Sequence, residues 1–241
     1  MNTARRIIVA LDFDTVDDAE AIVDRLGDAG QSYKVGLELL TVAGPALATR
    51  LAGEGKDVFL DLKLFEIPTS VAGAVRAAGR LGATMVTVHA MGGLKIMEAA
   101  VRAAADFPQL RVIALTVVTS LTDADLAAVG LTDTVEEQVT RLARLARRAG
   151  CHGVVASPQD AASLRTELGP DLLIVTPGVT LRAETNTEHA RPAHASAAIH
   201  AGATHVVIGR SLTRAPDPAA VLARLHDELA MPTRPSSGPA L

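Results

Sequence analysis

The chain has 241 residues, of which 49% are hydrophobic and only 2% aromatic, and its formal net charge is −4 at pH 7. A barrel of alternating strands and helices commonly takes about 250 residues as one domain, so no second domain is needed. The weak, interspersed charge excludes a basic field for nucleic acid and a polybasic patch for a membrane surface, which leaves a small molecule as the expected partner.

Short apolar runs alternate along the chain with stretches of helical periodicity, as is typical of βα units around a parallel sheet. The first run is too short for a signal peptide or a membrane span, and we expect a cytoplasmic protein. Strands are expected at 7–11, 33–36, 58–62, 85–89, 112–117, 153–156, 172–176 and 205–208. Helices are expected at 17–29, 38–53, 69–81, 93–105, 134–149, 158–168, 194–201 and 218–229. We expect residues 1–230 to form a barrel and residues 231–241, rich in Pro, Ser and Gly, to form a flexible tail.

Eight such units predict a closed (β/α)8 TIM barrel rather than an open doubly wound sheet. A dinucleotide-binding sheet is disfavoured because no Gly-x-Gly-x-x-Gly pattern follows the first strand. Polar or glycine residues stand at or just beyond the strand ends, namely Asp12, Lys34, Asp61, Lys63, His89, Thr119, Ser120, Ser157, Gly209 and Arg210. In a barrel these ends meet at one rim, where active sites lie.

Asp61 and Lys63 are two residues apart at the end of the third strand, so both side chains leave the same face. Lys34 ends the second strand and Asp12 follows the first, which predicts alternating carboxylate and ammonium groups in the mouth of the barrel. Such an array satisfies its own charges, whereas unpaired buried charges are costly. We interpret the array as catalytic, and the alternative is an ion-pair network that only closes the mouth. A metal site is disfavoured because two lysines would compete with the cation.

The eighth strand ends at Gly209 and Arg210, and the seventh is followed by Gly178, which are the places where barrels bind phosphate. Glycine lets the backbone approach an anion, the following helix offers free N–H groups, and arginine adds a charged contact. The alternative is a turn glycine beside a solvated arginine. Two connections are longer than turns require: 119–134, with an expected short helix, and 177–191, a candidate lid.

Nine segments spread over the predicted barrel resemble those of one known family. They are Val9-Ala10-Leu11-Asp12, Lys34-Val35-Gly36-Leu37-Glu38-Leu39, Val58-Phe59-Leu60-Asp61-Leu62-Lys63, Ile67-Pro68, Val88-His89-Ala90, Val118-Thr119-Ser120, Gly153-Val154-Val155-Ala156-Ser157, Thr176-Pro177-Gly178 and Val207-Ile208-Gly209-Arg210. Together and in this order they resemble the bacterial branch of orotidine 5′-phosphate decarboxylase. The family's fold is the same (β/α)8 barrel.

The resemblance implies a carboxy-lyase that converts orotidine 5′-phosphate to UMP in pyrimidine nucleotide biosynthesis, working as a homodimer with shared active sites. It implies Lys63 as the proton donor, Asp61 as the carboxylate beside the departing CO₂, Lys34 as the group that orders the array, and Glu66 as the second acid. The implied substrate contacts are Asp12 and Lys34 at the ribose, Thr119 at the pyrimidine, and Gly209 with Arg210 at the phosphate. No metal, flavin or thiamine cofactor is implied.

The sequence departs from the family's pattern at two places. The motif Asp-x-Lys-x-His-Asp-Ile-Pro reads Asp61-Leu62-Lys63-Leu64-Phe65-Glu66-Ile67-Pro68 here, so a histidine is lost and the second acid is longer by one methylene. In the candidate lid, Pro-Gly-Ile-Arg becomes Pro177-Gly178-Val179-Thr180, and Asp-Gln-x-Arg becomes Glu188-His189-Ala190-Arg191. Arg182 could then reach the phosphate and His189 could replace the glutamine, and the alternative is that both are ordinary loop residues.

Three functions remain open from the sequence. The leading one is decarboxylation of orotidine 5′-phosphate, or of a related nucleotide by a divergent paralogue. A sibling activity on a sugar phosphate, in which magnesium holds an enediolate, is disfavoured by Lys34, because those relatives carry glutamate there. A catalytically silent nucleotide-binding homologue is disfavoured because both lysines and Asp61 are retained.

Overall fold

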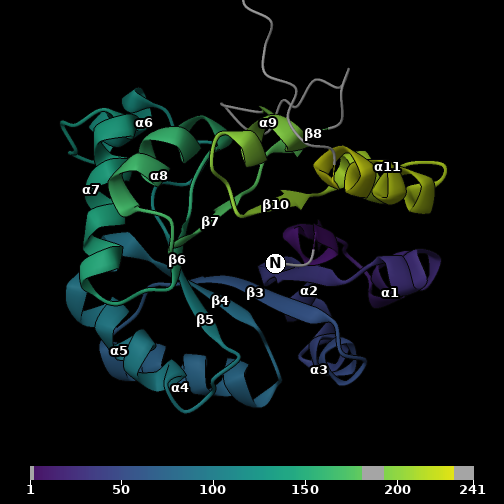
Figure 1. The fold of residues 1–241 in the computed structure, drawn as a ribbon. Coiled ribbons are helices and arrows are strands. Elements are labelled where there is room, and N and C mark those ends of the chain that lie inside the picture. Colours follow the sequence, from purple (N-terminus) through teal and green to yellow (C-terminus); the bar gives the residue numbers. More distant parts are fainter. Residues whose placement is uncertain (1–2, 181–192, 231–241) are drawn as a thin grey trace, which may run out of the picture.

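The computed structural model describes residues 3–180 and 193–230, and its centre is a closed barrel of parallel strands (Figure 1). The strands are β1 Ile7–Ala10, β2 Ser32–Gly36, β3 Asp57–Leu64, β4 Met85–His89, β5 Arg111–Leu115, β6 Gly153–Val155, β7 Leu173–Thr176 and β10 His205–Ile208. They close in the order β1-β10-β7-β6-β5-β4-β3-β2. The predicted (β/α)8 TIM barrel is confirmed.

Helices follow the strands and cover the outside of the barrel (Figure 1). They are α1 Val16–Leu26, α2 Leu37–Ala43, α3 Ala46–Gly53, α4 Pro68–Arg80, α5 Leu94–Ala104, α6 Asp123–Ala128, α7 Val135–Arg148, α8 Ala161–Leu168, α9 Ala195–His200, α10 Arg210–Thr213 and α11 Pro218–Ala230. Short 3-10 helices are η1 Thr3–Arg6, η2 Gly27–Ala29, η3 Ala90–Gly92 and η4 Pro158–Asp160. The short helix expected within 119–134 is confirmed as α6. Across the described ranges, no helix is long and apolar enough to cross a membrane.

The single helix predicted over 38–53 is wrong, because the chain forms α2 and α3 with a break at Gly44 and Pro45. Gly44 has a φ of 61°, in a region that residues with a side chain rarely adopt. Pro45 has no N–H to donate into a continuing helix. The Gly-Pro pair is therefore a stop signal that outweighs the helical periodicity on either side of it.

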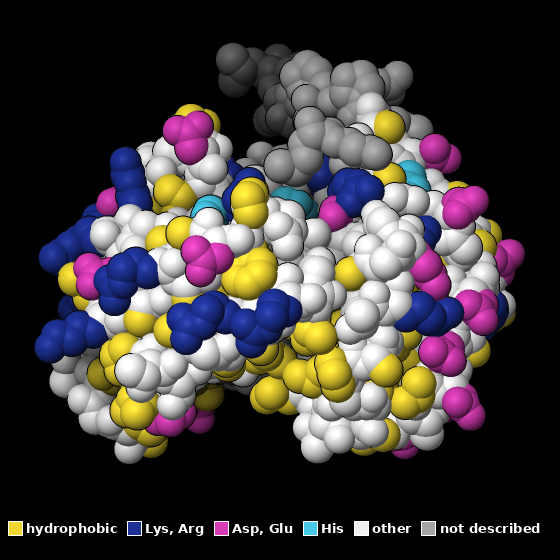
Figure 2. Space-filling view, turned by 90° about the horizontal axis from the view of Figure 1, so that it is seen from below, with side chains coloured by type: hydrophobic (Ala, Val, Ile, Leu, Met, Phe, Trp, Pro, Cys, Tyr) yellow, Lys and Arg dark blue, Asp and Glu magenta, His cyan; other side chains and the backbone are white. Residues whose placement is uncertain are grey.

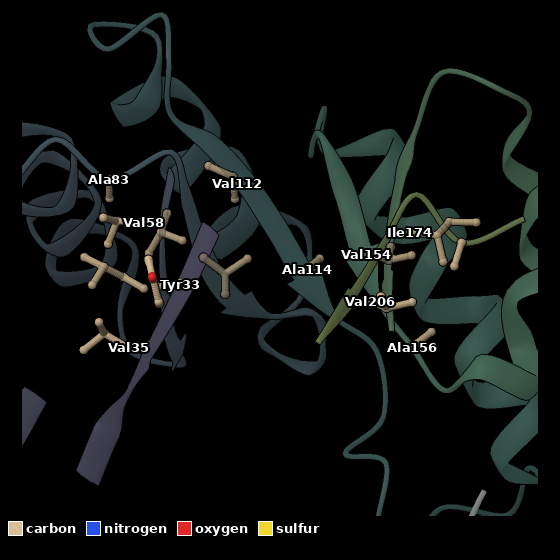
Figure 3. Close-up of a cluster of buried hydrophobic side chains, with 14 of the residues drawn as sticks. Tyr33, Val35, Val58, Ala83, Val112, Ala114, Val154, Ala156, Ile174 and Val206 are labelled. Atoms are coloured by element: carbon tan, nitrogen blue, oxygen red, sulfur yellow. The ribbon is translucent and has the colours of Figure 1, made fainter. Parts of the chain in front are cut away.

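Alternation along the strands divides the core into two layers. The inner layer fills the barrel and consists of Ile8, Ala10, Phe59, Ile113, Leu115, Val155, Val175 and Val207. The outer layer packs between the sheet and the helices, and Figure 3 shows part of it, including Tyr33 on β2, Val112 on β5 and Ile174 on β7. Figure 2 views the side on which α3, α4 and α5 lie, where Lys and Arg side chains form a row and hydrophobic side chains gather toward the lower edge.

A buried histidine lies at the end of the barrel where the strands begin. His205 starts β10, and its Nδ1 lies 2.9 Å from the Oγ1 of Thr204. Burial, followed by the positive charge of Arg6, lowers the pKa of His205 to about 4. An unfolded chain binds a proton on histidine at about pH 6.5, so the folded and unfolded states differ in protonation between these two pH values.

We expect the contribution of His205 to the free energy of unfolding to be fully present above about pH 6.5. It should be lost as the pH falls toward about 4, because between these values only the unfolded chain protonates His205. The loss from this one group is about 3 kcal/mol, at 1.36 kcal/mol per pH unit. Urea unfolding at two pH values within and above this window measures it. His205→Gln should lose less stability than the wild type, whereas His200→Gln, at an exposed histidine ending α9, should behave like the wild type. Equal losses in His205→Gln and the wild type would contradict this assignment.

Candidate active site

The predicted charged residues lie at inward-facing positions in, or just after, the neighbouring strands β1, β2 and β3. Phe59 belongs to the inner layer, so Asp61, two residues further along β3, also faces the barrel axis. Ala10, the last residue of β1, also belongs to the inner layer, so Asp12, two residues further along, is placed on the same inward side. Lys34 lies opposite Phe59 in the register between β2 and β3. The hydrophobic inner layer thus forms a floor, and the charged side chains stand above it in the mouth.

The four charged side chains, Asp12, Lys34, Asp61 and Lys63, form a continuous chain of ion pairs that we call the charged array. Lys34 Nζ lies 2.7 Å from Asp12 Oδ1 and 3.8 Å from Asp61 Oδ2. Lys63 Nζ lies 2.9 Å from the same Oδ2 of Asp61. The side chains of Lys34 and Asp61 are only 11% and 15% exposed, against 37% for Lys63. Lys63 is therefore the ammonium group that is more open to an incoming molecule.

The strand that carries Asp61 and Lys63 is irregular at this point. Leu60 lies opposite Val86 and Leu64 opposite Val88, so three residues of β3 face the single residue between them on β4. Among the described residues other than glycine, Lys63 alone has a positive φ, at 49°. That conformation costs roughly 1–2 kcal/mol for a residue with a side chain, and such strain is concentrated at functional sites. The bulge gives Asp61 and Lys63 room to turn toward each other.

Thr87, the residue of β4 opposite the bulge, was missed in the sequence analysis. Its side chain is fully buried, and its Oγ1 accepts a hydrogen bond from the backbone N–H of Lys63 at 2.8 Å. The same hydroxyl donates to Asp61 Oδ1 at 3.0 Å. The available signal was its position two residues before His89, at an inward-facing site of the fourth strand.

His89 ends β4 and caps the following turn, because its Nδ1 accepts a hydrogen bond from the N–H of Met91 at 3.3 Å. Burial, and then the charge of Lys63, lower the pKa of His89, so both favour the neutral form of the imidazole. The ring of Phe65 lies 5.7 Å from the His89 ring, between centroids, in a tilted arrangement. Phe65 thus contacts His89 from a position where the family pattern has a histidine.

Glu66 lies apart from the charged array. Its side chain is exposed, and its Oε1 accepts a hydrogen bond from the N–H of Ile67 at 2.8 Å. In the part of the chain that the structure describes, Glu66 forms no ion pair with Lys63, whose ammonium group is paired with Asp61. A role for Glu66 therefore requires either a movement of this loop or a second copy of the chain.

The expected phosphate end lies where β10 passes into α10. Gly209 precedes the first residue of that helix, and a Cβ placed on it would meet only the Cβ of Ala10, at 3.8 Å. The space in front of Gly209 is therefore open on the side of the inner layer. Arg210 begins α10 and is exposed, and Thr119 is buried in the turn after β5.

The two ends of the candidate lid meet in a short ladder. β8 Val179–Thr180 pairs in parallel with β9 Ala193–His194. The intervening residues 181–192, which include Arg182 and His189, lie outside the described part of the chain. The connection after β7 thus leaves and returns at adjacent positions. In the described ranges, no three His, Cys, Asp or Glu side chains are grouped so as to hold a metal ion.

Residues 5–225 match the family described as orotidine 5′-phosphate decarboxylase / HUMPS. The chain belongs to this family. It is 48% identical over 225 residues to the orotidine 5′-phosphate decarboxylase of Nitrosomonas europaea, and the match covers 93% of this chain and 97% of that protein. The orotidine 5′-phosphate decarboxylase of Chromohalobacter salexigens is 47% identical over 229 residues, which cover 94% of this chain and 97% of the relative.

Two solved structures closely resemble this fold. The crystal structure of orotidine 5′-phosphate decarboxylase from Lactobacillus acidophilus has a TM-score of 0.84 at 32% identity, covering 94% of this chain and 100% of that one. A conserved, uncharacterized protein from Geobacillus kaustophilus has a TM-score of 0.82 at 36% identity, covering 92% and 99%. The family resemblance inferred from the motifs is confirmed over nearly the whole chain.

Proposed function

We propose that this protein is a carboxy-lyase that converts orotidine 5′-phosphate to UMP in pyrimidine nucleotide biosynthesis, without a cofactor. The observation that carries the proposal is the charged array at the strand ends, in which Lys63 Nζ lies 2.9 Å from Asp61 Oδ2. Its support is the membership of a family whose relatives, at 48% and 47% identity, bear that enzyme's name. Because a charged nucleotide does not cross a membrane unaided, we also propose that the protein acts in the cytoplasm.

The reaction needs a fixed cation beside the carbon that loses CO₂. Breaking the bond between C6 of the pyrimidine and its carboxylate leaves the electron pair on C6, in the plane of the ring, where no π system delocalises it. The Lys63 ammonium would stabilise this charge and then transfer a proton to C6, and solvent would restore the proton on its nitrogen. CO₂ leaves as the other product. Of the two ammonium groups in the charged array, Lys63 is the more exposed, at 37% against 11% for Lys34, which supports its role as the cation that meets the substrate.

The remaining members of the charged array prepare Lys63 for this step. Asp61 holds the ammonium group in place, and its negative charge would lie beside the substrate's carboxylate, which favours loss of neutral CO₂. Lys34 bridges Asp61 and Asp12 and so fixes the spacing of the two carboxylates. Asp12, the most exposed member at 52%, is available to hydrogen-bond the ribose hydroxyl groups, together with Lys34.

The far end of the nucleotide would be held by groups around the rim. Gly209 and Arg210 offer an open backbone approach and a guanidinium for the phosphate. We propose Thr119 as a contact of the pyrimidine, Arg182 as a second phosphate contact, and His189 as a contact of the base. Phosphate binding far from C6 supplies energy for closing the lid and ordering the site, because binding energy from a non-reacting part can be used in the transition state.

We propose that the active protein is a homodimer in which Glu66 acts across the interface. Phe65 and Ile67, on either side of Glu66, are 60% and 59% exposed, and Leu37 at the start of α2 is 56% exposed. Large apolar side chains exposed beside a functional site are typical of a protein contact surface. A two-fold axis through this surface would place each Glu66 near the charged array of the other copy, which fits its separation from its own Lys63.

Mixing two inactive variants tests the shared sites. We expect Lys63→Ala and Glu66→Ala each to be inactive as pure dimers. After unfolding and refolding together in equal amounts, half of the dimers are hybrids, and each hybrid has one site with both residues native. About 25% of the wild-type activity should therefore return. Refolding each variant alone is the control, and no recovery in a mixture shown to contain hybrid dimers would contradict the shared site.

The activity itself is tested by incubating the purified protein with orotidine 5′-phosphate and following the loss of ultraviolet absorbance as UMP forms. We expect turnover that a metal chelator leaves unchanged. Tight binding of the nucleotide without turnover would instead favour a silent binding protein. Turnover of a ketose phosphate that stops on removal of magnesium would favour the sibling activity.

A further inference from the structure

We propose that Thr87 is a positioning residue for the reaction, because its single hydroxyl group holds both the backbone of Lys63 and the carboxylate of Asp61. The inference rests on the proposed function for its kinetic consequence. The two hydrogen bonds of Thr87 do not depend on which substrate binds at the charged array. Thr87 lies on β4, whereas both residues that it contacts lie on β3, so the contact couples two neighbouring strands of the barrel.

The direction of both hydrogen bonds follows from the chemistry of the groups. The backbone N–H of Lys63 can only donate, so Thr87 Oγ1 accepts from it at 2.8 Å. The same hydroxyl donates its proton to Asp61 Oδ1 at 3.0 Å, and the other carboxylate oxygen, Oδ2, faces the two ammonium groups. Thr87 is fully buried, which leaves no water to replace either bond. Its hydroxyl is therefore held in one orientation.

The bulge in β3 explains why this hydroxyl is needed. Between the pairs Leu60–Val86 and Leu64–Val88 the strands lose their regular register. In a regular parallel ladder, backbone carbonyls of the neighbouring strand accept the N–H groups of such residues. The N–H of Lys63 instead finds a side-chain oxygen, and the positive φ of Lys63 is stabilised by that bond. Thr87 thus closes the gap that the bulge opens.

Because of this contact, the two oxygens of the Asp61 carboxylate have different partners. Oδ1 is occupied by the Thr87 hydroxyl, so the carboxylate cannot rotate about its terminal bond without losing a buried hydrogen bond. Oδ2 is left for the ammonium groups of Lys63 and Lys34 at 2.9 and 3.8 Å. Because a displacement of 1 Å in a reacting group can cost orders of magnitude in rate, this orientation bears on proton transfer from Lys63.

The test compares the isosteric variant Thr87→Val with the conservative variant Thr87→Ser. Thr87→Val removes the hydroxyl, keeps the volume, and leaves the Asp61 oxygen and the Lys63 N–H without this partner. We expect kcat to fall by about 10- to 100-fold with KM changed less than about threefold, because the loss is of orientation rather than of a substrate contact. Thr87→Ser retains the hydroxyl and should recover most of kcat.

Thr116→Val is the matched control, because Thr116 is also a fully buried threonine whose hydroxyl donates to a neighbouring strand, at Val155 O, 3.0 Å away. It should lose thermal stability with little change in kcat. An equal fall of kcat in Thr87→Val and Thr116→Val, or an equal fall in Thr87→Val and Thr87→Ser, would overturn the proposal.

A crystal structure of Thr87→Val provides a readout that does not depend on turnover. We expect the Asp61 carboxylate to be rotated and the pair between Lys63 and Asp61 to be displaced, whereas Thr87→Ser keeps the wild-type geometry. An unchanged pair in Thr87→Val would overturn the inference even if the wild type decarboxylates its substrate. A wild type that fails to turn over orotidine 5′-phosphate would contradict the proposed function alone.

Discussion

Replacing Lys63 by alanine is expected to lower kcat for decarboxylation by at least about 10⁴-fold, since the variant loses both the proton donor and the cation that stabilises the developing charge. General acid catalysis contributes roughly 10²- to 10⁴-fold, and a preorganised charge adds roughly 10²- to 10³-fold. The measurement is the rate of ultraviolet absorbance loss with orotidine 5′-phosphate at saturation, together with binding of UMP by calorimetry. UMP lacks the carboxylate, so we expect its binding to change much less than kcat.

The same strand supplies a control for this variant. Lys56 immediately precedes β3 at the opposite end of the barrel, where its Nζ donates to Gly27 O at 3.1 Å. Lys56→Ala also removes a lysine side chain, but from the end of the barrel opposite the charged array. It should keep kcat within about threefold of the wild type, because surface substitutions away from a site have small effects. A Lys63→Ala variant that retains more than about a tenth of the wild-type kcat would remove Lys63 from the role of proton donor.

Asp61→Asn is expected to produce the second largest effect, a fall in kcat of about 10³-fold. The amide has nearly the same shape, but it leaves the ammonium groups of Lys34 and Lys63 without the carboxylate that separates them. Removing one partner of a poorly solvated ion pair leaves an uncompensated charge, and the lysines should move apart. Steady-state kinetics should show the loss mainly in kcat, and thermal unfolding should show a lower Tm.

Asp57→Asn is the matched control for this charge. Asp57 begins β3 at the other end of the barrel and pairs with Arg5, with 2.6 Å between Arg5 Nη1 and Asp57 Oδ1. The pair is partly exposed, so its loss should cost about 1 kcal/mol or less and leave kcat within about threefold. If Asp57→Asn and Asp61→Asn lower kcat equally, the effect of Asp61→Asn comes from the fold rather than from the charged array.

Much of the charged array could be predicted from the sequence, because successive side chains of a strand point to opposite faces of the sheet. Asp61 and Lys63 are two residues apart on β3, Lys34 lies on the neighbouring strand β2, and Asp12 follows β1, the next strand beyond β2. Once eight parallel strands are recognised, their carboxyl ends must share a rim, so these side chains are brought together by topology alone. The ion pairs in the structure confirm that placement.

The position of Glu66 was beyond this kind of reasoning. The family motif places an acid three residues after the lysine, but this spacing does not reveal where in the fold the side chain of the acid lies. In the structure Glu66 lies outside the charged array, between the exposed side chains of Phe65 and Ile67. The side chains of this exposed loop are not fixed by packing within the described chain, so strand alternation could not place Glu66.

The strand of Asp61 and Lys63 shows where the sequence by itself is sufficient and where the tertiary structure decides. Local alternation and the order of the strands determined which residues face the mouth. The bulge in β3, the positive φ of Lys63 and the two hydrogen bonds of Thr87 were decided only by the packing of β3 against β4. A register shift depends on hydrogen-bond partners some two dozen residues away along the chain, and no local pattern within either strand encodes that pairing.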